Sequence, residues 1–198
     1  MSQRSIQVAE ELRKIQNRKL SNFISSKAYP FSPYYRKLFD AHKIKPQYIK
    51  TAEDLKIIPF TQKEDLLSTQ DNPKRFLDFI LQPDESKIKK YLPKDKLLCM
   101  ALLKVFRGKE YLKHRLEKEY RPIFLTATTG TTNQSISFLY TDYDIQNLHI
   151  SGYRLLEVFA GTGEIRGVNL FPYAPHLAFW QTVFGGISHN AFLLSTGG

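Results

Sequence analysis

The sequence predicts an α/β protein in which a helical N-terminal region is followed by a mostly parallel βαβ sheet. Three observations predict this fold class. Apolar residues recur at helical spacing up to residue 120, short apolar runs alternate with helical stripes after residue 121, and nine of the ten glycines lie in that second part. With 198 residues, of which 42% are hydrophobic, the chain is long enough to bury a core.

The charge distribution changes at the same place. Residues 1–120 carry 26 of the 29 Lys/Arg and 15 of the 19 Asp/Glu, whereas residues 121–198 carry three basic and four acidic residues. We therefore predict a basic helical region over 1–120 and a Gly/Thr-rich α/β region over 121–198. The basic residues alternate with acids and no nucleic-acid-binding motif accompanies them, so a solvated helical surface is favoured and a nucleic-acid partner is disfavoured.

Composition also limits the cellular compartments and the kinds of metal site that are compatible with the sequence. Cys99 is the only cysteine, which excludes an internal disulfide framework and any multi-cysteine metal site. Residues 1–20 are charged throughout, and the longest apolar run, Leu97 to Phe106, is too short to span a bilayer. We expect a cytoplasmic protein with no metal site in these residues and no membrane partner.

The first half of the N-terminal region is predicted to consist of short helices. An apolar stripe predicts a first helix that Pro30 and Pro33 end; the stripe consists of Val8, Leu12, Ile15 and Phe23. A second stripe lies over residues 34–39.

Two capping boxes then predict two more helix starts, on either side of Pro59. In each, a threonine is followed three residues later by an acid, as Thr51-x-x-Asp54 and Thr61-x-x-Glu64.

Residues 94–120 are predicted to form a helical hairpin. Gly108 would supply the turn and Pro122 would end the second helix. The expected inner faces are apolar, with Leu97, Leu98, Ala101, Leu102 and Val105 on the first helix and Tyr111, Leu112, Leu116 and Tyr120 on the second.

After residue 121 the pattern predicts alternating strands and helices. A turn is expected at Gly185-Gly186. Strands are predicted at 123–125, 136–140, 168–171 and 191–194, and helices from 141 to 159 and from 176 to 184.

The segment from Thr126 to Gln134 is the strongest indication of chemistry. Five threonines and one glycine lie between two predicted strands, although threonine is a poor choice for an idle turn. Hydroxyls and amides around one flexible glycine can wrap a phosphate chain without a fixed charge. The alternative is a threonine-rich loop with no ligand. A Walker-type loop is excluded, because Thr132 is followed by Asn133 and not by the start of a helix.

These residues resemble a known family. Thr128-Thr129-Gly130-Thr131-Thr132 is similar to the phosphate loop of the adenylate-forming enzymes, the acyl-CoA synthetase superfamily, and the similarity is greatest to the phenylacetate–CoA ligase branch. Three further blocks agree in order and spacing, namely Ser32 to Arg36, Asp54 to Leu66, and Tyr140-Thr141-x-x-Asp144. The sequence departs from the family pattern at Asn133, Ser135 and Ile136, and the last change removes a lysine from the phosphate site.

A second block, Asn169 to His176, resembles the family segment that lines the acyl pocket. By that match His176 would lie near the substrate carboxylate, with Phe179 and Trp180 as pocket walls. The alternative is a capping or core histidine beside a proline turn, with both aromatic residues as ordinary core.

The resemblance implies an incomplete N-terminal domain of the adenylate-forming fold. Residues 94–120 look like a subfamily insertion, and the downstream half, the C-terminal domain and the catalytic residues are expected after Gly198. The implied reaction is ATP-dependent ligation of a small carboxylic acid to CoA with Mg²⁺, and the chain alone is expected to be inactive. Two rival hypotheses stay open: a non-catalytic basic module that binds an anion or nucleic acid, and a truncated product without activity.

Overall fold

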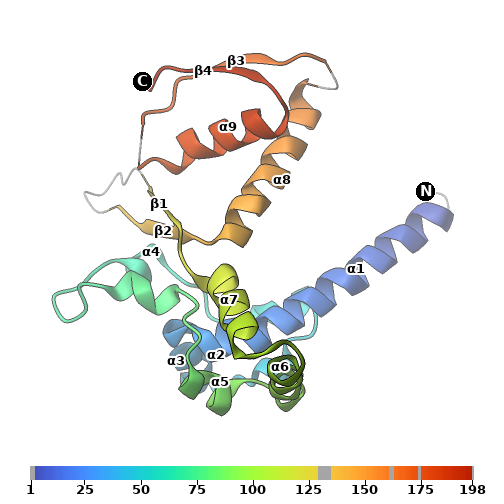
Figure 1. The fold of residues 1–198 in the computed structure, drawn as a ribbon, viewed down its shortest axis with the longest axis vertical. Coiled ribbons are helices and arrows are strands. Elements are labelled where there is room, and N and C mark those ends of the chain that lie inside the picture. The colour runs from blue at the N-terminus through green and yellow to red at the C-terminus, as the bar shows by residue number, and fades with distance from the viewer. Residues whose placement is uncertain (1–2, 129–134, 161–162, 174, 198) are drawn as a thin grey trace. The chain divides into compact units, whose positions relative to one another are not determined.

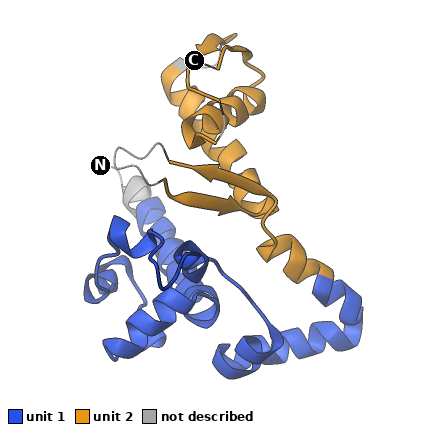
Figure 2. Ribbon diagram, turned by 90° about the vertical axis from the view of Figure 1, so that its left-hand side faces the viewer, with its two compact units in different colours: residues 1–113 blue, residues 114–198 orange. Residues whose placement is uncertain are grey.

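The computed structural model describes residues 3–128, 135–160, 163–173 and 175–197 (Figure 1). The chain is mostly helical and divides into two compact units, residues 1–113 and 114–198 (Figure 2). Each unit is described by itself.

The described part of the first unit contains helices and no strand. Its elements are α1 (Gln3–Phe23), the π-helix η1 (Ile24–Ala28), α2 (Tyr29–Phe31), α3 (Pro33–Ala41), the 3-10 helices η2 (Pro46–Tyr48) and η3 (Ala52–Ile57), α4 (Lys63–Leu66), the 3-10 helix η4 (Arg75–Phe79), α5 (Glu85–Tyr91) and α6 (Lys94–Arg107). The next helix, α7 (Lys109–Tyr120), contains the boundary between the units.

The helical run that begins with α1 continues past Pro30, which together with Pro33 was predicted to end the first helix. After α1 the hydrogen bonding widens into a π turn, in which the Tyr29 N–H donates to Ile24 O. Pro30 therefore occupies a first-turn position of α2, where no N–H is required, and the helical run ends at Phe31. The predicted apolar stripe of α1 is largely exposed, with 52% of Val8 and 54% of Leu12 accessible.

The core of the first unit forms where the π turn meets α3. Ser32 is fully buried and connects two segments, since its Oγ accepts from Tyr35 N (3.3 Å) and donates to Asp78 O (2.9 Å). The core residues are Ile24, Ala28, Phe39 and Ile49.

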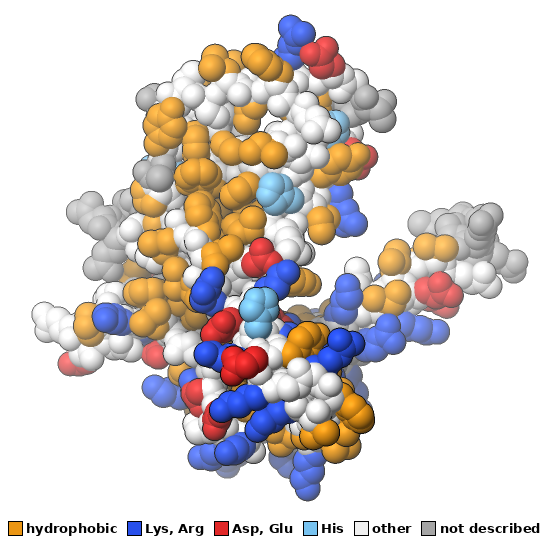
Figure 3. Space-filling model, in the orientation of Figure 1, with side chains coloured by type: hydrophobic (Ala, Val, Ile, Leu, Met, Phe, Trp, Pro, Cys, Tyr) orange, Lys and Arg blue, Asp and Glu red, His pale blue; other side chains and the backbone are white. Residues whose placement is uncertain are grey.

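Gly108, with φ +86°, separates α6 from α7. The apolar face of α6 that was predicted to pack inside a hairpin is exposed at Leu98, Leu102 and Val105. Figure 3 shows hydrophobic side chains beside lysine and arginine side chains in the lower part of the view, where α6 lies in Figure 1.

One of the two predicted capping boxes is confirmed and the other is shifted by one residue. Asp54 Oδ2 accepts from Thr51 N (2.8 Å), as expected. The second box is formed by Gln62 and Asp65, and not by Thr61 and Glu64, because α4 begins at Lys63. Asp65 Oδ2 accepts from Gln62 N (2.9 Å) and from the Tyr34 hydroxyl (3.0 Å), contacts that hold its pKa below the usual value.

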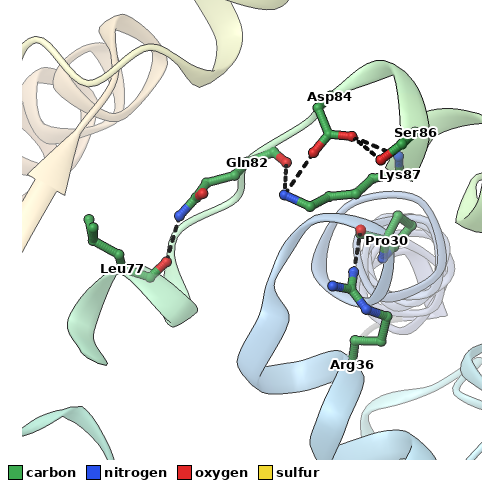
Figure 4. A network of polar contacts seen from close by, with 7 residues as sticks. All are labelled: Pro30, Arg36, Leu77, Gln82, Asp84, Ser86 and Lys87. Atoms are coloured by element: carbon green, nitrogen blue, oxygen red, sulfur yellow. Dashed lines mark hydrogen bonds and ion pairs between the residues drawn. The ribbon is translucent and has the colours of Figure 1, made fainter. Parts of the chain in front are cut away.

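A polar network fixes the start of α5 (Figure 4). Asp84 accepts from Ser86 Oγ (2.6 Å) and from Lys87 N (2.8 Å), and these hydrogen bonds hold the pKa of Asp84 well below its usual range. The Lys87 Nζ also donates to Gln82 O (2.9 Å), so the turn before α5 is connected to the helix by both backbone and side chain.

The second unit contains two small two-stranded sheets. Its elements are β1 (Phe124–Ala127), β2 (Ser137–Tyr140), α8 (Asp142–Ala160), β3 (Arg166–Asn169), α9 (Leu177–Ser188) and β4 (Phe192–Ser195). The predicted mostly parallel sheet is found only in part: β3 and β4 pair in parallel across α9, whereas β1 and β2 are antiparallel. In the described residues no helix lies between β1 and β2, and a parallel pair requires a longer crossover connection.

The turn predicted at Gly185-Gly186 is wrong, because both glycines lie inside α9. Gly185 packs directly against Gly152 of α8, and a Cβ on Gly152 would lie 2.4 Å from Gly185 Cα. The glycines therefore allow two helix backbones to approach closely. The chain turns later, at Asn190, whose φ is +54°.

Replacing Gly152 with Ala is expected to lower the free energy of unfolding by about 1–3 kcal/mol, because the new methyl group overlaps backbone atoms that cannot move alone. Urea unfolding followed by circular dichroism measures this. Gly163→Ala is the matched control, since a Cβ at that position would have no described atom within 4 Å. Equal stability of the two variants would show that α8 and α9 do not pack as described.

Candidate functional site

The candidate site is built around Ala127, at the end of β1. On one side β1 pairs with β2, with Ala127 opposite Ser137. On the other side the Ala127 N–H donates to Pro175 O (2.7 Å), and Ala127 forms a parallel bridge with His176. The backbone thus brings together two segments that the sequence singled out separately.

Thr128 closes the base of the threonine loop. Its N–H donates to Ile136 O (3.0 Å), and its Oγ1 accepts from Ile136 N (3.1 Å). The hydroxyl proton of Thr128 can still be donated to a ligand. The other predicted phosphate-binding residues, Thr129, Gly130, Thr131 and Thr132, lie outside the described residues.

Two buried polar atoms next to Ala127 have no hydrogen-bond partner in the described part of the chain. They are Oγ1 of Thr126, a residue that is fully buried, and Nδ1 of His176, a residue that is partly buried. Buried polar groups are nearly always paired, so each exception requires an explanation. The Nδ1 of His176, a residue that is bridged to Ala127, is therefore a candidate contact for a polar ligand at this end of β1.

The neighbouring Tyr140 phenol is neutral at physiological pH. Burial raises the pKa of Tyr140, and the nearby Thr126 hydroxyl opposes this rise without reaching hydrogen-bonding geometry. The pair therefore adds polarity but no charge to the inner face of β1.

Asn169 positions the segment that leads to His176, a role that the sequence reasoning missed. The side chain is 1% exposed; its Nδ2 donates to Phe179 O (3.2 Å) and its Oδ1 accepts from Phe171 N (3.2 Å). It thus connects the end of β3 to the start of α9. A polar residue at the end of an apolar strand is the sequence signal that could have identified it.

Aromatic packing supports the same segment from α9. The Trp180 ring lies edge-on to Phe124 of β1 at 5.1 Å and to Phe179 at 5.3 Å between centroids. Phe179 is 4% exposed. Trp180 is half-buried. The role of these two side chains as walls of an acyl pocket stays a prediction.

The Thr141 and Asp144 pair has a structural role at the start of α8. Asp144 Oδ2 accepts from Thr141 N (2.9 Å) and from Thr141 Oγ1 (2.8 Å), and Thr141 Oγ1 accepts from Asp144 N (3.3 Å). This reciprocal cap explains why a threonine and an acid stand three residues apart after β2.

The described ranges contain no cluster of metal ligands. No three His, Cys, Asp or Glu side chains there are placed to hold a metal ion.

Comparison with known proteins gives a structural match and no sequence match. No protein-family model and no curated protein sequence matches the chain. Among solved structures, the chain is similar to 2-hydroxyisobutyryl-CoA ligase in complex with 2-HIB-AMP and CoA in the thioesterification state. The TM-score is 0.66 at 17% sequence identity, over 96% of this chain and 32% of that chain.

This likeness defines the class of fold. The chain has the fold of part of an acyl-CoA ligase, and it spans about a third of the length of the ligase that it matches. At this level of identity the match concerns the fold alone.

Replacing Thr126 with Val is expected to raise the free energy of unfolding by about 1 kcal/mol without ligand, because it removes a buried hydroxyl that has no partner in the described part of the chain. Thermal unfolding of the full chain measures this. A loss of stability would mean that the hydroxyl is hydrogen-bonded in the folded protein.

Asn169→Ala is expected to lower the free energy of unfolding by about 1–3 kcal/mol, because it leaves Phe179 O and Phe171 N without their partner. Asn147→Ala, at an exposed position of α8, is the control. If Asn169→Ala left the free energy of unfolding unchanged, the positioning role of Asn169 would be contradicted.

Proposed function

We propose that this chain forms the N-terminal part of an ATP-dependent carboxylate–CoA ligase of the adenylate-forming superfamily, within the phenylacetate–CoA-ligase-like branch. The observation that carries the proposal is the meeting of Thr128 and His176 at one end of β1, beside two buried polar atoms without partners in the described residues. The fold shared with part of a CoA ligase supports it.

The reaction has two steps. A carboxylate oxygen attacks the α-phosphorus of ATP, the bond to pyrophosphate breaks, and an acyl-adenylate forms. The sulfur of CoA then attacks the acyl carbon, loses its proton to solvent or a base, and releases AMP.

In the first step the loop from Thr128 to Thr132 would hold the β- and γ-phosphates in line with the attack. Its hydroxyls and amides donate hydrogen bonds, which position the phosphates and stabilise the charge that develops on pyrophosphate. Because Ile136 stands where the broader superfamily has a lysine, this loop supplies no fixed positive charge there.

His176 would contact the substrate carboxylate. Its Nδ1 has no partner among the described residues, and an imidazole N–H donated to a carboxylate oxygen would orient the acid toward the α-phosphorus. The histidine is thus proposed as a substrate-binding residue.

The remaining catalytic groups are not assigned to this chain. The Mg²⁺ ligand, the CoA contacts and the catalytic lysine would lie outside residues 1–198, in an enzyme of the cytoplasm. Residues 1–198 alone are therefore expected to form no thioester above a no-enzyme control; measurable thioester formation would contradict this.

Thr131→Ala and Thr132→Ala are each expected to weaken ATP binding by roughly fivefold, equivalent to about 1 kcal/mol for one lost hydrogen bond. Isothermal titration calorimetry of the full chain measures this. Thr182→Ala is the control, because its hydroxyl donates to Ala178 O (2.9 Å) within α9.

Two results would contradict the proposal. One is the absence of ATP binding by the unmodified chain. The other is salt-dependent binding of random oligonucleotides without ATP binding, which is the behaviour of a basic nucleic-acid-binding module.

A further inference from the structure

The helix α6 carries the longest apolar run of the chain, and none of its residues is buried. The exposed fractions are 63% for Leu98, 48% for Leu102, and 78% for both Val105 and Phe106. No other described element packs extensively against this helix. An exposed apolar patch of this kind marks an interaction surface.

The exposed apolar side chains lie on one face of α6. They stand at positions i, i+4, i+7 and i+8, which follow one another along a helix surface. The basic residues Lys96, Lys104 and Arg107 project from other directions around the same 14-residue helix. The helix is therefore amphipathic, with an apolar face open to solvent and these three cations on the opposite face.

Positive charge continues on both sides of α6. Residues 85–113 contain nine Lys/Arg and three Asp/Glu. Aromatic rings lie beside some of these cations: Lys90 is 5.1 Å from the Tyr91 ring and Arg107 is 5.8 Å from the Tyr111 ring. Tyrosines and long basic side chains are well suited to the boundary between apolar and aqueous phases.

We propose that α6 binds an anionic lipid surface, with Leu98, Leu102, Val105 and Phe106 inserted among the acyl chains. A lipid surface offers an apolar layer and a continuous sheet of negative charge together, which matches an apolar face among dispersed lysines. A protein partner would be expected to make directed polar contacts with a few residues around the apolar face. Here the cations are spread over α5, α6 and the start of α7, which suits a continuous charged surface better. The inference does not depend on the proposed ligase function.

The helix lies in the interface and does not cross the bilayer. With 14 residues it is too short to span the hydrocarbon layer, and no described helix combines the length and hydropathy needed for a span. The sequence analysis expected no membrane partner because the apolar run is too short to span a bilayer. Binding of a helix to the surface of a bilayer does not require that length.

Vesicle co-sedimentation of the full chain tests the proposal. The chain is expected to sediment with vesicles of about one part phosphatidylserine to two parts phosphatidylcholine, and to stay in solution with phosphatidylcholine alone. Raising the salt to about 0.5 M is expected to weaken binding, because it screens the lysines. The double variant Val105→Asp/Phe106→Ser is expected to lower binding by roughly tenfold or more.

The chain provides a matched control for this variant. Val158 and Phe159 of α8 form a second Val-Phe pair, with exposed fractions of 82% and 79%. Val158→Asp/Phe159→Ser is expected to bind the anionic vesicles like the unmodified chain. Both pairs are exposed, so neither change removes core packing.

Three outcomes would overturn the proposal. They are equal binding to both kinds of vesicle, equal loss of binding in the two double variants, and no vesicle binding together with self-association that Val105→Asp/Phe106→Ser abolishes. The last outcome, seen by sedimentation equilibrium, would assign the apolar face to a second copy of the chain.

Discussion

The backbone hydrogen bond from Ala127 to Pro175 is the contact on which the candidate site depends. It adds the segment before α9 to the open side of β1, so that Thr128 and His176 reach the same end of one strand. The bond involves main-chain atoms only, and its geometry therefore does not depend on which side chain follows in the loop. His176, which this contact brings to β1, has a buried Nδ1 without a hydrogen-bond partner among the described residues.

The rest of the second unit holds that segment in place. The Gly152–Gly185 contact sets how closely α8 and α9 approach, and Asn169 connects the end of β3 to α9. Trp180 packs between Phe124 of β1 and Phe179 of α9. These contacts together hold the short segment between β3 and α9 that contains His176. A binding site needs such support from a rigid scaffold.

Features set by local chemistry were predictable from the sequence. The Thr51–Asp54 cap and the approximate positions of all four predicted strands follow from neighbouring residues. Features set by tertiary contacts were not predictable in this way. Gly185 signals a turn until its contact with Gly152 is known, and Pro30 signals a helix end until the π turn before it is seen. The bridge between Ala127 and His176 joins residues that are far apart in sequence, and a local sequence pattern cannot predict such a pairing.

The most direct test of the ligase account is an NMR titration of the isotope-labelled full chain with ATP. The account predicts saturable shifts of the Ala127, Thr128 and Ile136 amides and of the His176 ring, because the phosphates would occupy the end of β1. Shifts confined to the lysine-rich residues 85–113, or no saturable shift, would contradict it.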